Sequence, residues 1–151
     1  YARTLLSSLP PPGPLSSHLA GGELVCPLPP NPGSGGRCQQ LALELSILLH
    51  RGACGGRDVA VVCLGTDGTD GPNDAAGAVA TNDTVRRVFD AAEDKRGFGD
   101  ALAYAEDFRD RFDAYNFFRG PELGRIDIGP TGTNVADVVV AFCAREGELK
   151  F

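Results

Sequence analysis

The sequence predicts an α/β fold in which a mixed, mostly parallel sheet lies between two layers of helices. Apolar runs of strand length alternate along the chain with stretches whose apolar residues recur at helical spacing. The run Asp58 to Gly65 (DVAVVCLG) is continuous, rich in β-branched residues and bounded by glycine. Such a run is typical of a strand buried on both faces of a parallel sheet. A three-layer sandwich is therefore the expected architecture.

The clearest helix covers residues 38–49. Its apolar residues fall at i, i+3, i+4, i+7, i+10 and i+11, which places them on one side of a helix: Cys38, Leu41, Ala42, Leu45, Leu48 and Leu49. Arg51 and Gly52 follow, and a basic residue and then glycine are the usual C-terminal signals. We expect the N-cap at Ser34 or a neighbouring glycine.

The remaining elements follow from the same patterns. We expect the end of a helix at residues 1–8, a stiff connector at 10–17, a strand pair within 18–28 and a loop at 29–37. Short strands are predicted at 76–80, 124–129 and 134–144, and amphipathic helices begin near Asn82 and near Phe98, the latter broken once. Residues 1–19 are thus a linker or the end of a preceding helix, and residues 20–151 form the α/β domain.

The composition and net charge of the chain argue against some classes of binding partner. The chain has 151 residues, the size of one domain, with 42% hydrophobic and 23% charged residues. Fourteen basic and 20 acidic residues give a net charge of −6, which argues against nucleic acid or an anionic membrane as partner. It leaves room for a phosphate ligand, because one Arg, a bound cation and backbone amides suffice locally.

The cysteines and the first residue of the chain give expectations about the cellular location of the protein and about its full length. The five cysteines form no CxxC pair and only two histidines accompany them, so no zinc site is predicted. Cys63 and Cys143 lie in apolar runs and are expected to be small core residues. Reduced thiols favour a cytoplasmic location, and no apolar run reaches the ~20 residues that a membrane helix needs. The chain begins with Tyr1, so we interpret it as a fragment or mature piece of a longer protein.

Three glycine-rich loops are candidate sites. The first, GSGGR (residues 33–37), runs into the predicted helix, where amide groups and the helix dipole attract anions. Arg37 adds a guanidinium that can bind phosphate or carboxylate through two hydrogen bonds, although a cation there opposes the helix dipole. The alternative is a flexible linker followed by a solvated arginine.

The second loop, GTDGTDGPNDAAG (residues 65–77), follows the apolar strand. Asp67 and Asp70 are oxygen ligands of the kind that Mg²⁺ prefers, and the glycines allow tight turns between them. Neither an EF-hand nor a Walker A loop fits the spacing. A glycine-rich turn without a ligand is the alternative.

The third loop, GPTGTN (residues 129–134), precedes the last strand. Its two threonine hydroxyls and several amides suit an oxyanion or phosphate pocket, and a capped turn is the alternative reading. In a parallel sheet this loop would lie at the opposite end of its strand unless it folded back.

These segments together carry a resemblance. The stretches AGGELVCPL, GSGGRCQQLALE, CLGTDGTDGPNDAAGA, FDAYNFF and IGPTGTNVADVVV follow one another in the order and spacing of the MOFRL domain. This is the C-terminal domain of class II glycerate kinases, a family also described as hydroxypyruvate reductase-like. The resemblance covers about residues 20–140, and its GTDG-x-DGP-x-x-AAGA and GPTGTNV-x-D motifs are long and specific.

The resemblance implies a glycerate kinase that uses ATP and Mg²⁺ to phosphorylate D-glycerate in a cleft between this domain and a larger N-terminal glycerate kinase domain. Arg37, Asp67 and Asp70 are then the candidate catalytic residues, and Asp67 and Asp70 the candidate metal ligands. The candidate substrate- or phosphate-binding residues at matching positions are Glu23, Gly35, Gly36, Gln39, Gly68, Gly71, Thr131, Gly132, Thr133 and Asn134. Asp137 matches the last position of the third motif.

Some positions depart from the family pattern. The usual GGRNQE is GGRCQQ here, and the usual Asp-Ser-Tyr is Asp113-Ala114-Tyr115. The chain has only two lysines, and neither lies in a glycine-rich loop, so we expect the isolated chain to be inactive without residues from elsewhere. A homodimer is a further expectation. The competing hypothesis is a non-catalytic module that binds an anionic metabolite or pairs with another subunit.

Overall fold

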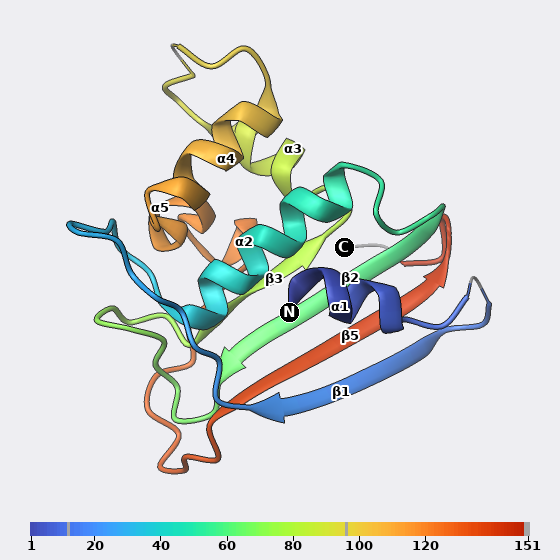
Figure 1. Cartoon of the computed structure of the whole chain (residues 1–151), viewed down its shortest axis with the longest axis horizontal. Helices are drawn as coiled ribbons and strands as arrows, with labels where there is room; N and C mark the ends of the chain where they lie inside the picture. Colours follow the sequence, from blue (N-terminus) through green and yellow to red (C-terminus); the bar gives the residue numbers. More distant parts are fainter. Residues whose placement is uncertain (12, 96, 150–151) are drawn as a thin grey trace.

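The computed structural model describes residues 1–11, 13–95 and 97–149 and contains a five-stranded sheet (Figure 1). The strands are β1 (Ser16–Gly22), β2 (Arg57–Gly65), β3 (Gly77–Thr81), β4 (Arg125–Ile126) and β5 (Asp137–Arg145), in the order β1-β5-β2-β3-β4. Every neighbouring pair is antiparallel. The α/β class is confirmed, but the prediction of a mostly parallel sheet is wrong.

The reason lies in how the last strand enters the sheet. Strands β1 and β2 are joined through helix α2 (Arg37–His50), and both run antiparallel to β5, so they point in the same direction. That is the outcome a helical crossover produces. They are not neighbours, however, because β5 inserts between them and makes both of its pairings antiparallel. The helix–strand alternation was read correctly, but it does not reveal which strand fills the gap.

The helices form one layer built around α2, which packs on β2 and β3. Around it lie α1 (Ala2–Ser8), α3 (Thr84–Ala91), α4 (Ala101–Asp110) and α5 (Ala114–Phe118), with the short 3₁₀ helix η1 at Pro121–Leu123. Figure 1 shows α1 and α2 in front of the same face of the sheet. The predicted helices near residues 38–49, 82 and 98–115 are confirmed, and the third is broken between α4 and α5. No helix in the described ranges is long and apolar enough to span a bilayer.

The two faces of the sheet differ. Under the helices, Val59, Val61 and Cys63 of β2 are fully buried, as are their neighbours on β5. On the other face, Val62 and Leu64 are only partly buried. The prediction that this strand is buried on both sides is therefore wrong, and the sheet has two layers rather than three. A continuous apolar run does not distinguish a strand covered twice from one whose second face is apolar but bare.

Antiparallel pairing gathers the glycine-rich loops at one edge of the sheet. Gly22 at the end of β1 and Gly65 at the end of β2 both pair with Asp137 at the start of β5. Gly77, which begins β3, pairs with Leu64 at the same edge. We call this edge, together with the N-terminus of α2, the rim.

The N-terminal segment is part of this fold. Leu5 and Leu6 of α1 are buried in the core, and β1 begins at Ser16. The strand pair expected within 18–28 is wrong, because only β1 forms there and an irregular segment leads from Glu23 to Gly36. The boundary near residue 20 stays a prediction, although α1 and the first part of β1 lie on the side that we had assigned to a linker.

Candidate functional site

The three glycine-rich loops touch one another at the rim. A Cβ atom on Gly36 would overlap the backbone of Asp70, and one on Gly71 would overlap the carbonyl oxygen of Gly35. The second and third loops meet in the same way, because a Cβ on Gly68 would overlap the carbonyl oxygen of Gly129. Glycine is required at these positions because backbones approach each other closely. The loops are therefore one packed unit rather than separate turns.

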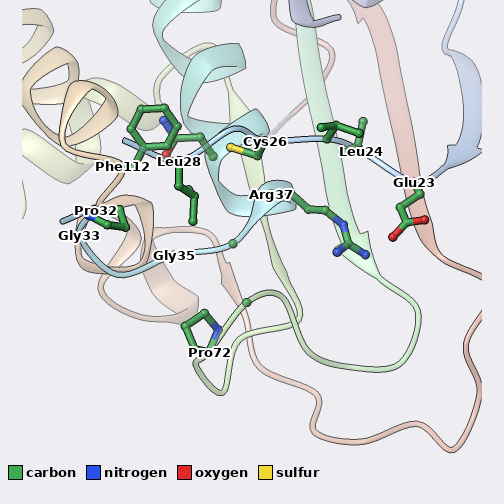
Figure 2. Close-up of a pocket in the computed structure, with 14 residues that line it drawn as sticks. Glu23, Leu24, Cys26, Leu28, Pro32, Gly33, Gly35, Arg37, Pro72 and Phe112 are labelled. Atoms are coloured by element: carbon green, nitrogen blue, oxygen red, sulfur yellow. The ribbon is translucent and has the colours of Figure 1, made fainter. Parts of the chain in front are cut away.

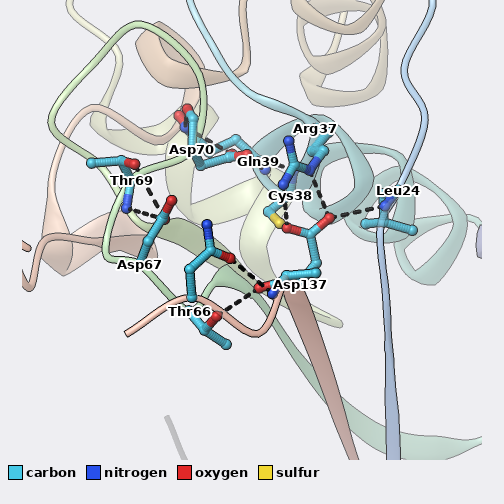
Figure 3. Close-up of polar contacts among 11 residues, drawn as sticks. Leu24, Arg37, Cys38, Gln39, Thr66, Asp67, Thr69, Asp70 and Asp137 are labelled. Atoms are coloured by element: carbon cyan, nitrogen blue, oxygen red, sulfur yellow. Dashed lines mark hydrogen bonds and ion pairs between the residues drawn. The ribbon is translucent and has the colours of Figure 1, made fainter. Parts of the chain in front are cut away.

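Arg37 is held by Asp137 at the centre of this unit (Figure 3). Its Nε donates to Asp137 Oδ2 at 2.7 Å and its Nη2 donates to Oδ1 at 2.9 Å. The backbone N–H of Leu24 donates to the same Oδ2 at 2.9 Å. Asp137 is 1% exposed, whereas the Arg37 side chain is 38% exposed. The pair thus joins a buried anchor to a cation that faces solvent.

The local register explains this geometry. Asp137 stands on β5 at a position that shares a face with Val139 and Ala141, which lie under the helices. Its carboxylate therefore points toward the N-terminus of α2, where Arg37 is the first residue. Burial raises the pKa of Asp137, but the hydrogen bonds from Arg37 and Leu24 outweigh it, so that the pKa lies below its ordinary value. The hydrogen bond to Asp137 in turn raises the pKa of Arg37.

Asp70 caps the same helix from a distant part of the chain. Its Oδ1 accepts the backbone N–H of Cys38 at 3.0 Å, and its Oδ2 accepts that of Gln39 at 2.8 Å. The Gln39 side-chain amide also donates to Asp70 Oδ2 at 3.0 Å. These amides are the ones that a helix N-terminus would otherwise offer to an anion. The expectation that α2 presents free amides to phosphate is therefore wrong at Cys38 and Gln39, because an internal carboxylate occupies them.

A third buried carboxylate fixes the loop before the helix. Asp113, 6% exposed, accepts the backbone N–H of Ser34 through Oδ1 at 2.9 Å. A Cβ on Gly33 would come within 2.5 Å of the Asp113 Cβ, so the loop lies directly against this side chain. We call Asp70, Asp113 and Asp137 the three clamp aspartates, because each holds one part of the segment from Gly33 to Gln39. They come from three separate segments of the chain.

A cavity of about 490 Å³ lies beside this clamped segment. Glu23 and Arg37 supply its charged groups, and Gly35, Gly36 and Gly71 supply backbone to its wall. Most of the remaining wall is apolar and comes from Leu24, Val25, Cys26, Leu28, Pro32, Pro72 and Phe112. Figure 2 shows Glu23 and Arg37 toward one side of the cavity, with Leu28, Pro32 and Phe112 toward the other. Burial raises the pKa of the Cys26 thiol, which keeps it in the neutral, unreactive form.

Within this unit, the second and third loops also form a more open ridge. Asp67 is half-buried, and its Oδ1 accepts the backbone N–H of Thr69 at 3.1 Å (Figure 3). The N–H of Thr131 donates to the backbone oxygen of Asp67 at 3.1 Å, and the Thr131 hydroxyl donates to the backbone oxygen of Thr66. Residues 131–135 are exposed. Ala136, just before Asp137, has φ of 65°, a conformation that costs energy in a residue other than glycine.

The predicted site residues thus separate into three groups. Those that line the cavity are Glu23, Gly35, Gly36, Arg37 and Gly71. Those on the ridge are Asp67, Gly68, Thr131, Gly132, Thr133 and Asn134. Gln39 and Asp70 lie beneath both, at 0% and 3% exposure. Gln39 Oε1 is buried without a hydrogen-bond partner among the described residues.

Two residues with clear roles were not among the predicted site residues, although Asp137 was identified as the last position of the third motif. Asp113 holds the first loop and Asp137 holds Arg37. Each left a signal in the sequence, because an acidic residue directly before or within an apolar run is costly to bury unless it is paired. Asp137 opens the run DVVVAFCA, and Asp113 precedes AYNFF.

Asp67 and Asp70, the predicted metal ligands, differ in the carboxylate oxygens that they leave available. No group of three or more His, Cys, Asp or Glu residues with a metal-binding arrangement occurs in the described part of the chain. Both Asp70 oxygens already accept hydrogen bonds from α2, whereas the hydrogen bonds that Asp67 accepts from Thr69 go to Oδ1. Mg²⁺ commonly takes only one or two carboxylates and completes its shell with water and substrate phosphate. The rim therefore suits a partial ligand set centred on Asp67, not a complete protein site.

Comparison with known proteins adds the family. The sequence profile of the MOFRL family matches residues 16–137. The chain is 37% identical over 122 residues to a D-glycerate 2-kinase of Thermotoga maritima, covering 80% of this chain and 25% of that protein. It is 40% identical over 122 residues to a glycerate kinase of Rattus norvegicus, covering 80% of this chain and 21% of that protein. The chain therefore spans about a quarter of the length of these relatives.

Solved structures agree with this relationship. A crystal structure of glycerate kinase from Thermotoga maritima superposes with a TM-score of 0.71 at 31% identity, covering 93% of this chain and 32% of that one. A protein of Pyrococcus horikoshii gives a TM-score of 0.68 at 27% identity, covering 86% of this chain and 26% of that one. The sequence motifs, the antiparallel sheet with its clamped rim and these matches lead to the same conclusion: the chain belongs to the MOFRL family and is a domain related to glycerate kinases.

Proposed function

We propose that this chain supplies one half of the active site of an ATP-dependent glycerate kinase. The observation that carries the proposal is the clamped Arg37, a partly exposed cation beside a cavity at the meeting point of three glycine-rich loops. The supporting context is the relationship to glycerate kinases, which are about four times as long as the matched segment. The other half of the site would come from the part of such an enzyme that this chain does not include.

Arg37 is our proposed contact for the glycerate carboxylate or the transferred phosphoryl group. A guanidinium has five N–H donors, and Asp137 uses one on Nε and one on Nη2, so three donors are free of that pair. The clamp also fixes the guanidinium plane, so little side-chain entropy is lost when an anion binds. Glu23, on the same wall of the cavity, is placed to accept hydrogen bonds from the glycerate hydroxyls.

Asp67 is our proposed metal-facing carboxylate, and Asp70 has a positioning role. In phosphoryl transfer a metal ion bound with ATP neutralises charge on the transferring group. Asp67, Gly68 and the Thr131–Asn134 loop present one carboxylate, two threonine hydroxyls and backbone amides along the ridge. Asp70 and Gln39 keep α2, and therefore Arg37, at a fixed distance from that ridge.

A graft tests the proposal directly. Residues 16–137 replace the matching quarter of the Thermotoga D-glycerate 2-kinase, and a coupled assay follows turnover of D-glycerate with ATP and Mg²⁺. We expect the graft to be active and Arg37→Ala to lower kcat/KM by at least about 100-fold. Arg51→Ala is the matched control, because Arg51 also forms an ion pair, with Glu106, but lies at the other end of α2.

The outcomes separate the two functional hypotheses. A folded but inactive graft favours the non-catalytic binding module. An active graft that tolerates Arg37→Ala contradicts the role of Arg37 while leaving the kinase assignment intact. The 151-residue chain alone is expected to show no turnover, and robust activity from it would overturn the division of the site between two parts.

A further inference from the structure

The cavity beside Arg37 is larger than glycerate and mostly apolar. Glycerate would fill roughly 150–200 Å³ at liquid-like packing, whereas the cavity has a volume of about 490 Å³. Its charged groups, Glu23 and Arg37, lie toward one side. Leu28, Pro32 and Phe112 lie toward the other side (Figure 2). Contacts of glycerate with Arg37 and Glu23 therefore use only the charged side of the cavity.

Phe112 has a backbone conformation that is unfavourable for phenylalanine. It follows α4 in a Schellman motif, in which the N–H of Phe112 donates to the backbone oxygen of Arg109 at 3.0 Å. In the same motif the N–H of Asp113 donates to the backbone oxygen of Phe108 at 2.9 Å. The residue after the C-cap is left-handed in this motif and is usually glycine, and Phe112 has φ of 55° there. The chain therefore places an aromatic ring where glycine would relieve strain.

Packing in the hydrophobic core does not explain the ring of Phe112. Among the described residues, five other phenylalanines belong to the core or pack against it, and Phe112 does neither. Its side chain is half-buried and lines the cavity instead. Strained residues cluster at active sites and ligand clamps, where the strain serves function. The placement of Phe112 therefore indicates that its ring contacts a ligand.

We propose that the apolar side of the cavity binds the adenine base of ATP, with the ring of Phe112 as its stacking platform. This inference rests on the proposed kinase function for the identity of the nucleotide. Of the two proposed substrates, only ATP has both a flat aromatic ring system and an anionic group. The cavity offers Phe112 for the first and Arg37 for the second. A base that stacks on an aromatic side chain gains affinity without a particular pattern of hydrogen bonds.

The charged groups of the cavity are arranged as the transfer of a phosphoryl group requires. With adenine on Phe112, the phosphates extend toward Arg37, whose three donors outside its pair with Asp137 bind them. Glu23 lies on the same side of the cavity as Arg37 (Figure 2), so glycerate bound there meets the terminal phosphoryl group. Arg37 is then the contact for the phosphoryl group, and Glu23 is the contact for the glycerate hydroxyls.

Ligand binding to the 151-residue chain tests the base site without turnover. Isothermal titration calorimetry compares ATP with inorganic tripolyphosphate, which has three phosphates and no base, both in the presence of Mg²⁺. We expect the wild-type chain to bind ATP at least about 10-fold more tightly than tripolyphosphate. Phe112→Leu should reduce this ratio to about threefold or less, because leucine offers no flat ring, and Phe112→Tyr should retain it. Phe98→Leu is the matched control, since Phe98 is also half-buried but lies at the other end of α4.

Thermal unfolding distinguishes a ring that binds a ligand from one that holds the fold. Phe112→Gly removes the ring but also relieves the left-handed strain, so we expect it to melt within about 2–4 °C of the wild type. It should nevertheless lose the preference for ATP over tripolyphosphate. A melting temperature below that range would show that the ring is structural and would overturn the base site.

The binding ratios decide the rest. A preference for ATP that falls in Phe112→Leu and persists in Phe98→Leu and Phe112→Tyr supports the site. Equal affinities of the wild-type chain for ATP and tripolyphosphate overturn it, as does a preference that survives both Phe112→Leu and Phe112→Gly. An inactive graft with an intact preference for ATP contradicts the kinase proposal and supports the base site, so the two proposals can fail separately.

Discussion

Asp67 and Asp70 belong to the same GTDGTDG stretch, three residues apart, yet they lie in different environments. Asp70 is 3% exposed and binds the amides of Cys38 and Gln39, so it is part of the protein interior. Asp67 is half-buried on the ridge, and its carboxylate accepts hydrogen bonds only from Thr69 of its own loop among the described residues. The two Asp-Gly pairs therefore differ in role: Asp70 holds helix α2 in place, whereas the carboxylate of Asp67 accepts no hydrogen bond from α2 in the described part of the chain. Substitutions that separate these roles sharpen the comparison.

The largest expected effect is at Asp70. Asp70→Ala leaves the buried backbone N–H groups of Cys38 and Gln39 without their acceptor and removes one of three hydrogen bonds of the Gln39 side-chain amide, so we expect it to lower the free energy of unfolding by about 3 kcal/mol. Urea denaturation monitored by circular dichroism measures this. Asp67→Ala is the matched control and should cost under about 0.5 kcal/mol. Equal losses at the two positions would contradict the assignment of separate roles.

Next are the glycines at which loops touch. Gly68 has φ of 89° and its Cβ would overlap the Gly129 carbonyl, whereas Gly132 has φ of 74° in open space. Gly68→Ala should therefore cost about 2–3 kcal/mol, from strain and a backbone displacement, and Gly132→Ala about 1 kcal/mol, from strain alone. Thermal unfolding of the pair measures the difference. If the two variants unfold alike, the second and third loops do not pack as described.

The contribution of the Arg37–Asp137 pair to the free energy of unfolding should depend on pH. Arg37→Ala leaves Asp137 buried without its cation, which should cost about 1–2 kcal/mol at pH 7, toward the low end because Arg37 is partly exposed. Burial raises the pKa of Asp137, but the hydrogen bonds from Arg37 and Leu24 lower it by more. The pKa in the folded chain therefore lies below the ordinary value of about 3.9. The stabilisation is complete above that ordinary value and is lost as pH falls through the folded one.

The difference in stability between wild type and Arg37→Ala should therefore shrink on acidification below about pH 4. Chemical denaturation at a series of pH values, with Arg51→Ala as a surface ion-pair control, tests this. A difference that stays constant from pH 7 to about pH 3 would show that Arg37 stabilises the fold by packing rather than through the carboxylate.

The sequence predicted the helices and the three loops well, because both depend on local signals. The apolar spacing from Cys38 to Leu49 marks α2, and repeated glycines mark loops. It failed on the direction of the sheet and on the second face, because the insertion of β5 between β1 and β2 is a long-range event. Had β5 been placed correctly, the third loop would have been predicted at the same edge as the second.

The candidate site shows the same difference between local signals, which the sequence reveals, and long-range contacts, which it does not. Residue type and the glycine-rich spacing singled out Arg37 and the glycines as candidate site residues. It did not predict that Asp70 serves α2, because Asp67 and Asp70 have identical local sequence signals, each following Thr and preceding Gly. Their difference arises only when Gly36 packs on the backbone of Asp70 and brings the helix N-terminus to that carboxylate. Chemistry that depends on a contact 32 residues away is not encoded in a three-residue repeat.

A small stability effect is expected where the ridge is most open. Thr131 is exposed, and its hydroxyl donates to the backbone oxygen of Thr66, so Thr131→Val should change the free energy of unfolding by under about 1 kcal/mol. In the grafted enzyme, however, it should raise KM or lower kcat, because it removes a hydroxyl from the proposed phosphate-facing loop. Thr69→Val is the control, since Thr69 is also exposed but its hydroxyl bonds only to Asp67 of its own loop. A Thr131 variant with unchanged kinetics would limit the proposed substrate contacts to Arg37 and its cavity. The ridge would then have a structural role, like the clamp aspartates, and no contact with the phosphate.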